Sequence, residues 1–275
     1  MIAPRAKVLP KEITLHGDTR VDDYFWLRDR SDPGVIPYLE AENRYTAEVM
    51  EPTKSLQDGL YHEILGRIQE TDVSVPVKRD DYFYYTRTEE GRAYSIQCRK
   101  RGVLEAPEEI LLDSNALAEG QKYFRLGNFA VSPDHRLLAY STDLEGDESY
   151  TIQVKDLSTG ELLPDRIENT YYSLEWANDN RTFFYTVLDA TKRPYRALRH
   201  ELGATSDTLV YQEDDGRFNL GLAKTRSRRF IFIELASAIT SELRYVDADD
   251  PHGQPQVLLP RRQGRHRKES LDLAE

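Results

Sequence analysis

A repeated phrase is the feature of this 275-residue sequence that most restricts its fold. The stretch FAVSPDHRLLAYSTD at residues 129–143 is followed 45 positions later by LEWANDNRTFFYTVLD at residues 174–189. Aligning the two brings four pairs of residues together: Asp134 with Asp179, Arg136 with Arg181, Leu138 with Phe183, and Tyr140 with Tyr185. A turn-forming Ser-Pro-Asp or Ala-Asn-Asp precedes each apolar run. The chain therefore repeats one structural unit.

Both halves of this unit occur again elsewhere in the chain. KTRSRRFIFIEL holds another copy of the first half, in which Phe230 and Phe232 are predicted to correspond to Leu138 and Tyr140, 92 positions earlier in both cases. A less regular copy, KRDDYFYYTRTE, occupies residues 78–89. The second half recurs as YSIQCRKR from Tyr94, YTIQVKDL from Tyr150, YRALRHEL from Tyr195 and SELRYVDA from Ser241. Four units of roughly 45 to 55 residues are therefore expected.

The composition of each unit predicts short strands. Tyr, Phe, Thr, Ile and Val dominate the apolar runs, and clusters of Gly, Asp, Asn and Ser bound them. A repeat of this length with about four strands is typical of a propeller blade, whose sheet needs a neighbour on each face. The alternative is a β-sandwich with accidental internal similarity. Because the register holds across both halves of three units, we predict an all-β fold with a partial β-propeller of about four blades at residues 73–260.

Residues 1–72 follow a different pattern, which predicts an N-terminal helical extension. Asp32 and Pro33 favour the start of a helix. Its apolar stripe is formed by Tyr38, Ala41, Tyr45 and Val49. A second helix is expected to carry apolar residues at every fourth position, namely Leu56, Leu60, Ile64 and Ile68. This second stripe requires an apolar partner, which is either the propeller itself or a domain outside these residues.

Composition argues against several classes of partner. A net charge of −11 disfavours nucleic acid, which proteins bind largely by neutralising phosphates with Lys and Arg. No run approaches the length of a membrane span, and the N-terminus lacks the apolar core of a secretory signal. We therefore predict a cytoplasmic protein with no nucleic-acid or membrane partner. Cys98, the sole cysteine, permits no intrachain disulfide and is expected to be a packed strand residue.

No motif predicts a catalytic, cofactor-binding or metal-ligating residue. The G-x-S-x-G turn that exposes the nucleophile of α/β-hydrolases does not occur. His62-Glu63 and His200-Glu201 each begin like H-E-x-x-H, but neither has a second His one helical turn later. Both are expected to be surface pairs. The six histidines lack metal-ligand spacing, so no metal or other cofactor is expected.

One acidic segment raises the possibility of peptide binding. Its carboxylates are Asp143, Glu145, Asp147 and Glu148. They would attract cationic peptides if they faced a central channel. The alternative, which we favour, is a solvated hairpin loop.

The run LHGDTRVDDYFWLRDRSDPGVIPYLEAENRYTAEVM resembles the N-terminal segment of the prolyl oligopeptidase family of serine peptidases, and its oligopeptidase B branch in particular. The family patterns D-x-Y-x-W-L-R-D and Y-L-x-x-E-N are carried by Tyr24, Trp26, Leu27, Arg28, Asp29, Pro33, Tyr38, Leu39, Glu42 and Asn43. ILLDSNALAEG, VSPDHRLLAYSTDLEGDE and TSELRYVDADDP continue the resemblance to about Pro260.

The resemblance implies a fold and an activity for a longer enzyme. In this family a helical segment leads into a seven-bladed propeller and then into a C-terminal α/β-hydrolase domain with the catalytic Ser, Asp and His. The implied activity is cleavage of short peptides after Lys or Arg, with His taking the proton from Ser and backbone donors holding the oxyanion. None of the catalytic positions has a counterpart in residues 1–275, so the hydrolase domain is absent and the chain alone is expected to be inactive.

Two other functions remain open at this stage. The first is a non-catalytic propeller scaffold that binds peptides or proteins, although the repeats lack the Gly-His and Trp-Asp dipeptides of WD40 blades. The second is a fragment that complements a separately encoded hydrolase domain. The implied partners are accordingly short basic peptides for the complete enzyme, or a hydrolase-containing chain.

Residues 261–275 are expected to form a divergent tail. They carry a charge of +2, whereas the other 260 residues carry −13. The tail reads RRQGRHRKESLDLAE where relatives continue into further blades, so we hypothesise a premature stop after a frame change near Gly264. Four blades of seven would leave sheet faces and edges exposed, which predicts marginal stability in isolation. A cooperative, monomeric melt well above about 60 °C would contradict this expectation.

Overall fold

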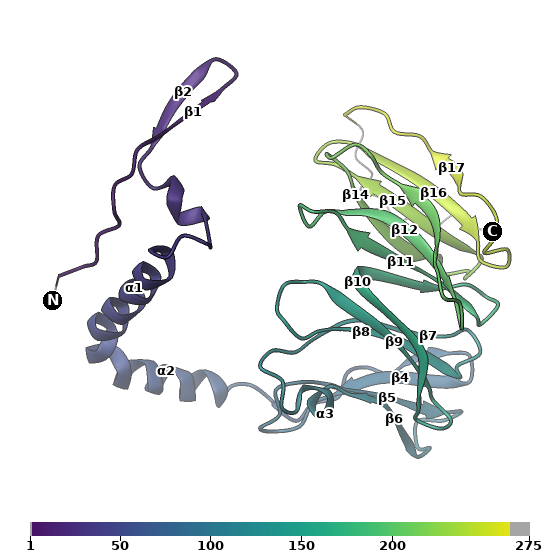
Figure 1. Ribbon diagram of the computed structural model, residues 1–275. Coiled ribbons are helices and arrows are strands. Elements are labelled where there is room, and N and C mark those ends of the chain that lie inside the picture. The colour runs from purple at the N-terminus through teal and green to yellow at the C-terminus, as the bar shows by residue number, and fades with distance from the viewer. Residues whose placement is uncertain (1, 265–275) are drawn as a thin grey trace. The chain divides into compact units, whose positions relative to one another are not determined.

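The protein divides into two compact units, Met1–Glu70 and Thr71–Glu275. The structure, a computed structural model, describes residues 2–264. The N-terminal unit consists of β1 (Lys11–Leu15), β2 (Asp18–Asp22), η1 (Phe25–Arg28), α1 (Val35–Met50), η2 (Glu51–Thr53) and α2 (Lys54–Leu65). Figure 1 shows α1 and α2 joined end to end through the short η2 turn.

The two predicted helices are present, with one difference at the end of the second. Asp32 lies just before α1, where its Oδ1 accepts the N–H of Gly34 at 2.8 Å. Helix α2 ends at Leu65, so Ile68 lies beyond it and the prediction of a helical Ile68 is wrong. Gly66 follows the last helical residue, and glycine is a weak helix former because it loses the most backbone entropy.

The apolar pattern missed the hairpin formed by β1 and β2. The turn consists of His16 and Gly17, both with positive φ, at 50° and 81°. Such two-residue turns match the twist of paired strands and favour Gly. The strand residues are exposed apart from a half-buried Asp22, so no alternation of buried and exposed positions marks them in the sequence.

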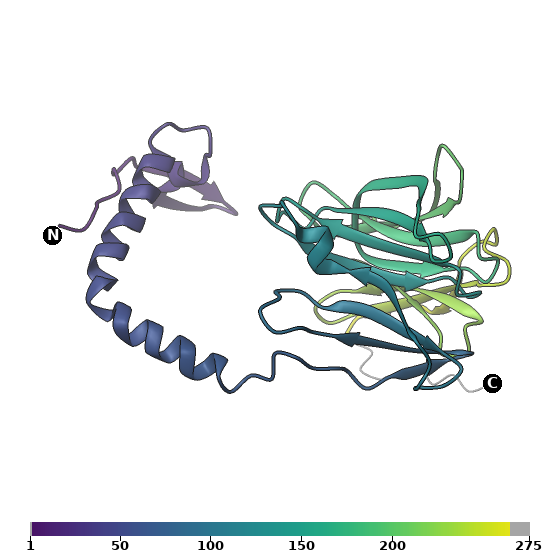
Figure 2. The ribbon, with the colours of Figure 1, turned by 90° about the horizontal axis from the view of Figure 1, so that it is seen from below.

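The second unit is built from antiparallel strands that pair in chain order. They are β3 (Val77–Arg79), β4 (Tyr82–Arg87), β5 (Ile96–Arg101), β6 (Glu108–Asp113), β7 (Arg125–Val131), β8 (Leu137–Asp143), β9 (Tyr150–Asp156), β10 (Leu162–Trp176), β11 (Thr182–Leu188), β12 (Pro194–Glu201), β13 (Thr208–Gln212), β14 (Asn219–Lys224), β15 (Phe230–Ala236), β16 (Ser241–Asp247) and β17 (Gln256–Leu259), with the short helix α3 (Ser114–Ala118) after β6. Figures 1 and 2 show the sheets of this unit stacked face to face.

Within residues 71–264 the hydrogen-bonded sheets number three, but they form four blades. The central sheet has seven strands, because β10 is shared between two blades. The first part of β10 pairs with β9 as far as Thr170, and the last part pairs with β11 from Thr170 to Trp176. Asn169, with a φ of 58°, interrupts the register between the two parts. The outer strand of the second blade thus continues as the inner strand of the third, which confirms the all-β partial propeller.

The repeats correspond to equivalent strands, but the register predicted for the fourth blade is wrong by one residue. In the second, third and fourth blades the residues paired across the first turn are Val131 with Leu138, Trp176 with Phe183, and Lys224 with Ile231. Ile231 and Ile233, not Phe230 and Phe232, are therefore equivalent to Leu138 and Tyr140. Aromatic identity misled the alignment, because β15 has buried residues on both of its faces and alternation alone does not fix its register.

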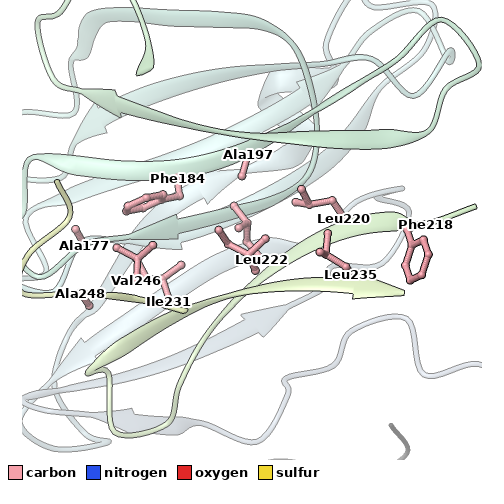
Figure 3. Close-up of a cluster of buried hydrophobic side chains, with 11 residues drawn as sticks. Ala177, Phe184, Ala197, Phe218, Leu220, Leu222, Ile231, Leu235, Val246 and Ala248 are labelled. Carbon is pink, nitrogen blue, oxygen red and sulfur yellow. The ribbon is translucent and has the colours of Figure 1, made fainter. Parts of the chain in front are cut away.

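Apolar cores lie between consecutive blades. Between the third and fourth blades, Phe184 and Ala197 pack with Leu220, Ile231 and Leu235, as Figure 3 shows. A second cluster joins the second and third blades: Ala139, Ile152, Val154, Leu174, Trp176, Phe183 and Tyr185. A third joins the first and second: Leu111, Leu112, Val131, Leu138 and Tyr140. Consecutive blades thus bury the apolar faces that they turn toward each other, as the blade prediction requires.

Two further expectations concern Cys98 and the tail. Cys98 is 1% exposed in β5, and burial raises the pKa of its thiol to about 11, so it is the packed residue predicted. The predicted tail begins at Arg261, whose guanidinium bonds Glu213 at 2.6 Å and Glu242 at 2.7 Å. This residue therefore packs against the third and fourth blades. Residues 265–275 of the tail lie outside the described residues.

Candidate functional site

Two histidines of the propeller, His135 and His200, take part in polar networks with carboxylates. The prediction that His200 is a surface residue is wrong: it is 4% exposed, and its ring lies between two carboxylates. Nε2 is 2.8 Å from Asp165 and Nδ1 is 2.6 Å from Asp207. Side chains of β12 alternate between the two faces of its sheet, and His200 lies on the face toward the second blade, where Asp165 of β10 is. His62, by contrast, is exposed on α2, as predicted.

The acidic loop between β8 and β9 is held together by its own carboxylates. Asp143 is buried, and its side chain accepts the backbone N–H groups of Glu145, Gly146 and Glu148 at 2.8 to 3.0 Å. Two of the other three carboxylates form ion pairs elsewhere in the propeller: Asp147 with Lys192 at 3.0 Å and Glu148 with Arg125 at 3.6 Å. These contacts favour the hairpin-loop interpretation over a cationic-peptide site.

A hollow of about 520 Å³ lies where the first strands of all four blades meet. Strand β3 contributes Lys78 and Arg79, and β14 contributes Lys224. The turn after β14 adds Arg226 and Arg228. The remaining wall is Phe129, Ala130, Val131, Pro133, Leu174, Glu175, Trp176 and Thr225. The hollow therefore brings five cations and one carboxylate against an apolar wall.

The electrostatics of the hollow follow from burial. Burial lowers the pKa of Lys224 to about 8, although the negative charge of Glu175 opposes the change. Lys224 Nζ donates to the Trp176 carbonyl and to Asn178 Oδ1, both at 2.6 Å. Burial also raises the pKa of Glu175, the only carboxylate in the lining described. Both groups are thus shifted toward their neutral forms, whereas the arginines remain charged.

The blade turns beside the hollow are linked by Asp80. This residue of the first turn bonds Arg228 in the fourth blade, with Oδ1 3.0 Å from Nη2 and Oδ2 2.5 Å from Nη1. It also lies 3.0 Å from Nε2 of His135, whose Nδ1 is 2.6 Å from the Tyr84 hydroxyl. The hydrogen bonds from Arg228 are the largest cause that holds the pKa of Asp80 at about 2. One carboxylate thus connects the first, second and fourth blades.

The sequence reasoning did not identify this hollow. Its signal is two basic stretches, VKR at residues 77–79 and KTRSRR at residues 224–229, each at the end of the first strand of a blade. Equivalent turns of different blades meet at one end of a propeller, so these distant stretches become neighbours. No group of three or more His, Cys, Asp or Glu side chains in residues 2–264 is arranged to hold a metal ion. Over the same residues, no helix has the length and apolarity to cross a membrane.

Comparison with known proteins extends these observations. Residues 4–271 match the family model described as "Prolyl oligopeptidase, N-terminal beta-propeller domain". Protease 2 of Moraxella lacunata is 40% identical over 273 residues, and dipeptidyl aminopeptidase BI of Pseudoxanthomonas mexicana is 42% identical over 266 residues. These alignments cover 96% and 90% of this chain but 40% and 37% of the relatives.

Solved structures give the same result at the level of the fold. Oligopeptidase B from Leishmania major superposes with a TM-score of 0.89 at 29% identity, and the Trypanosoma brucei enzyme with covalently bound antipain at 0.86 and 32%. Each match covers 96% of this chain and 40% of the solved one. The chain thus spans about two fifths of the length of the proteins that it matches.

Proposed function

The chain belongs to the prolyl oligopeptidase family of serine peptidases as an N-terminal propeller region, and from this premise we propose that the complete enzyme cleaves short peptides after Lys or Arg. The observation that carries the proposal is the match over residues 4–271, which runs through the N-terminal unit and the four blades. The likeness to oligopeptidase B at a TM-score of 0.89 supports the basic specificity. We place the enzyme in the cytoplasm.

In this proposal residues 1–275 restrict access to a catalytic centre and do not perform the reaction. The rings of His135 and His200 bond carboxylates and a phenol, and none of these bonds is to a serine hydroxyl. A serine nucleophile requires an adjacent base to remove its proton. We therefore expect the 275-residue polypeptide alone to be inactive, with the catalytic residues supplied by a further hydrolase segment.

A second specificity follows from the relative that is 42% identical, which is named a dipeptidyl aminopeptidase. An enzyme of that kind removes dipeptides from a free N-terminus. A peptide blocked at its N-terminus is a substrate for the endopeptidase alone, so blocked and unblocked versions of one Arg-Arg substrate separate the two activities.

The first experiment treats the purified 275-residue chain with a fluorophosphonate probe and with fluorogenic Arg-Arg peptides. We expect neither labelling nor hydrolysis. Specific labelling of one serine, together with turnover of the peptides, would show that these residues form a catalytic centre by themselves. That result would overturn the proposal that a further hydrolase segment supplies the catalytic residues.

The second experiment supplies the hydrolase segment in trans. Protease 2 of Moraxella lacunata, from which the segment matched by this chain has been deleted, is co-expressed with residues 1–275. Recovered cleavage of blocked peptides after Lys or Arg, absent when either chain is expressed alone, would support the proposed function. Stable folding of both chains without association or activity would favour the non-catalytic scaffold instead.

A further inference from the structure

The charge of the hollow is opposite to that of the whole chain. The protein carries a net charge of −11, yet the lining holds Lys78, Arg79, Lys224, Arg226 and Arg228 against Glu175. Like charges that converge in this way repel one another and raise the local positive potential. We propose that the hollow binds a small oxyanion of the phosphate class, either free or as a phosphate ester.

Three of these cations form no close ion pair in the part of the chain that the structure describes. Within residues 2–264, no ion pair within 4.0 Å involves Lys78, Arg79 or Arg226. A guanidinium presents a fork of donors that matches two oxygens of a phosphate, which makes the two arginines the principal ligands in this proposal.

The wall and the size of the hollow favour a compact ligand. Val131, Leu174 and Trp176 line part of the hollow, and all three residues are nearly fully buried. Charges act more strongly next to such a surface than in bulk water. A volume of about 520 Å³ accommodates a phosphate ester with its first waters, but it excludes a folded nucleic acid.

Two of the nearby carboxylates, Glu175 and Asp80, are weakened as competitors for the cations. Burial raises the pKa of Glu175, which reduces its repulsion of an anion. Asp80 is held by Arg228 and His135, so it competes with the ligand only for Arg228. Removing the charge of Asp80 would release Arg228 toward the hollow and is expected to strengthen anion binding.

The test is calorimetric titration of the 275-residue chain with inorganic phosphate at constant ionic strength, maintained with sodium chloride. We expect saturable binding at one site. Phenyl phosphate is titrated in parallel, and tighter binding of this compound than of inorganic phosphate would identify an ester as the preferred form. Arg79→Gln and Arg226→Gln are each expected to weaken binding about tenfold, because a tenfold loss corresponds to about 1.4 kcal/mol, the lower range for a charge-assisted bond.

Two further variants test the proposal: a matched control outside the hollow, and a variant that is expected to tighten binding. Arg136→Gln removes the same charge from the exposed turn of the second blade, outside the hollow, and should leave the dissociation constant unchanged. Asp80→Asn should tighten binding, which a general loss of folding could not produce. Unsaturable heats, or equal weakening by Arg136→Gln and Arg226→Gln, would overturn the site and leave the proposed peptidase function unaffected.

Discussion

The N-terminal unit and the propeller unit carry equally regular apolar patterns, yet only the propeller buries them. Among residues 2–70, Val35 alone is buried. Leu56, Leu60 and Ile64 of α2 are 63%, 48% and 59% exposed, whereas Phe184, Ile231 and Ile233 of the propeller are fully buried. This difference shows that an apolar periodicity specifies a helix or strand. Whether the apolar side chains are buried depends on whether the chain also supplies a surface that packs against them.

Repetition supplies that partner in the propeller. Each blade presents the same kind of apolar face, so the next copy along the chain covers it, as Ala197 and Phe184 meet Leu220 and Leu235 in Figure 3. The helices of the N-terminal unit are not repeated. Their exposed stripe fits the expectation that it covers another surface, which in the proposed enzyme is that of the hydrolase domain.

The largest expected effect is the loss of a side chain between blades. Phe184→Ala leaves a cavity in the core shared by the third and fourth blades and should reduce the free energy of unfolding by about 3–5 kcal/mol. Leu60→Ala, on the exposed stripe of α2, should change it by less than about 0.5 kcal/mol. Urea unfolding of the two variants, followed by tryptophan fluorescence, measures the contrast. Equal effects would show that the α2 stripe is buried in the folded chain.

A second pair of variants makes the same Gly→Ala substitution in both units, and the expected effects on stability are opposite. At Gly127 of β7, a Cβ would lie 2.5 Å from a ring carbon of Tyr150 and 2.6 Å from Ser141 Oγ. Because both neighbours are fully buried, Gly127→Ala should destabilise the propeller by about 1–3 kcal/mol. At Gly59 of α2, nothing lies within 4 Å, so Gly59→Ala should stabilise the helix by up to about 1 kcal/mol. Thermal melts of the β-sheet and helix circular dichroism signals report the two effects, and destabilisation at Gly59 would contradict an open helix face.

The repeat made most of the fold predictable. Asp134 and Asp179 lie in equivalent turns just before strands β8 and β11, so local turn chemistry and alternation predicted the blades directly. Two parts of the fold were predicted wrongly or missed. The register of β15 was wrong because this strand is buried on both faces. The β1–β2 hairpin was missed because its exposed residues show no alternation of buried and exposed positions. These errors arise because the pattern of apolar residues indicates which positions are buried, but it does not indicate which residues of two strands pair.

The candidate hollow was less accessible to sequence reasoning for a different reason. Its cations come from residues 78–79 and 224–228, which become neighbours only when the first strands of four blades converge. The misplacement of His200 has a similar origin, since its partner Asp165 lies 35 positions away in the chain. Polar contacts between residues far apart in the chain produce no periodic pattern in the sequence from which they could be predicted.

The smallest expected effect concerns Lys224, a charge buried in the propeller, compared with the exposed Lys54 at the start of α2. Burial lowers the pKa of Lys224 from 10.5 to about 8, so between these pH values the unfolded state binds more protons than the folded state. The free energy of unfolding therefore gains a contribution of about 1–2 kcal/mol as the pH rises from about 8 to 10. Lys224→Met should lose this rise, and Lys54→Met controls for the loss of one positive charge. Urea unfolding at several pH values gives the free energy of unfolding as a function of pH. Parallel pH profiles for the wild type and Lys224→Met would mean that Lys224 keeps its proton on folding. The hollow would then be better hydrated than its apolar wall implies.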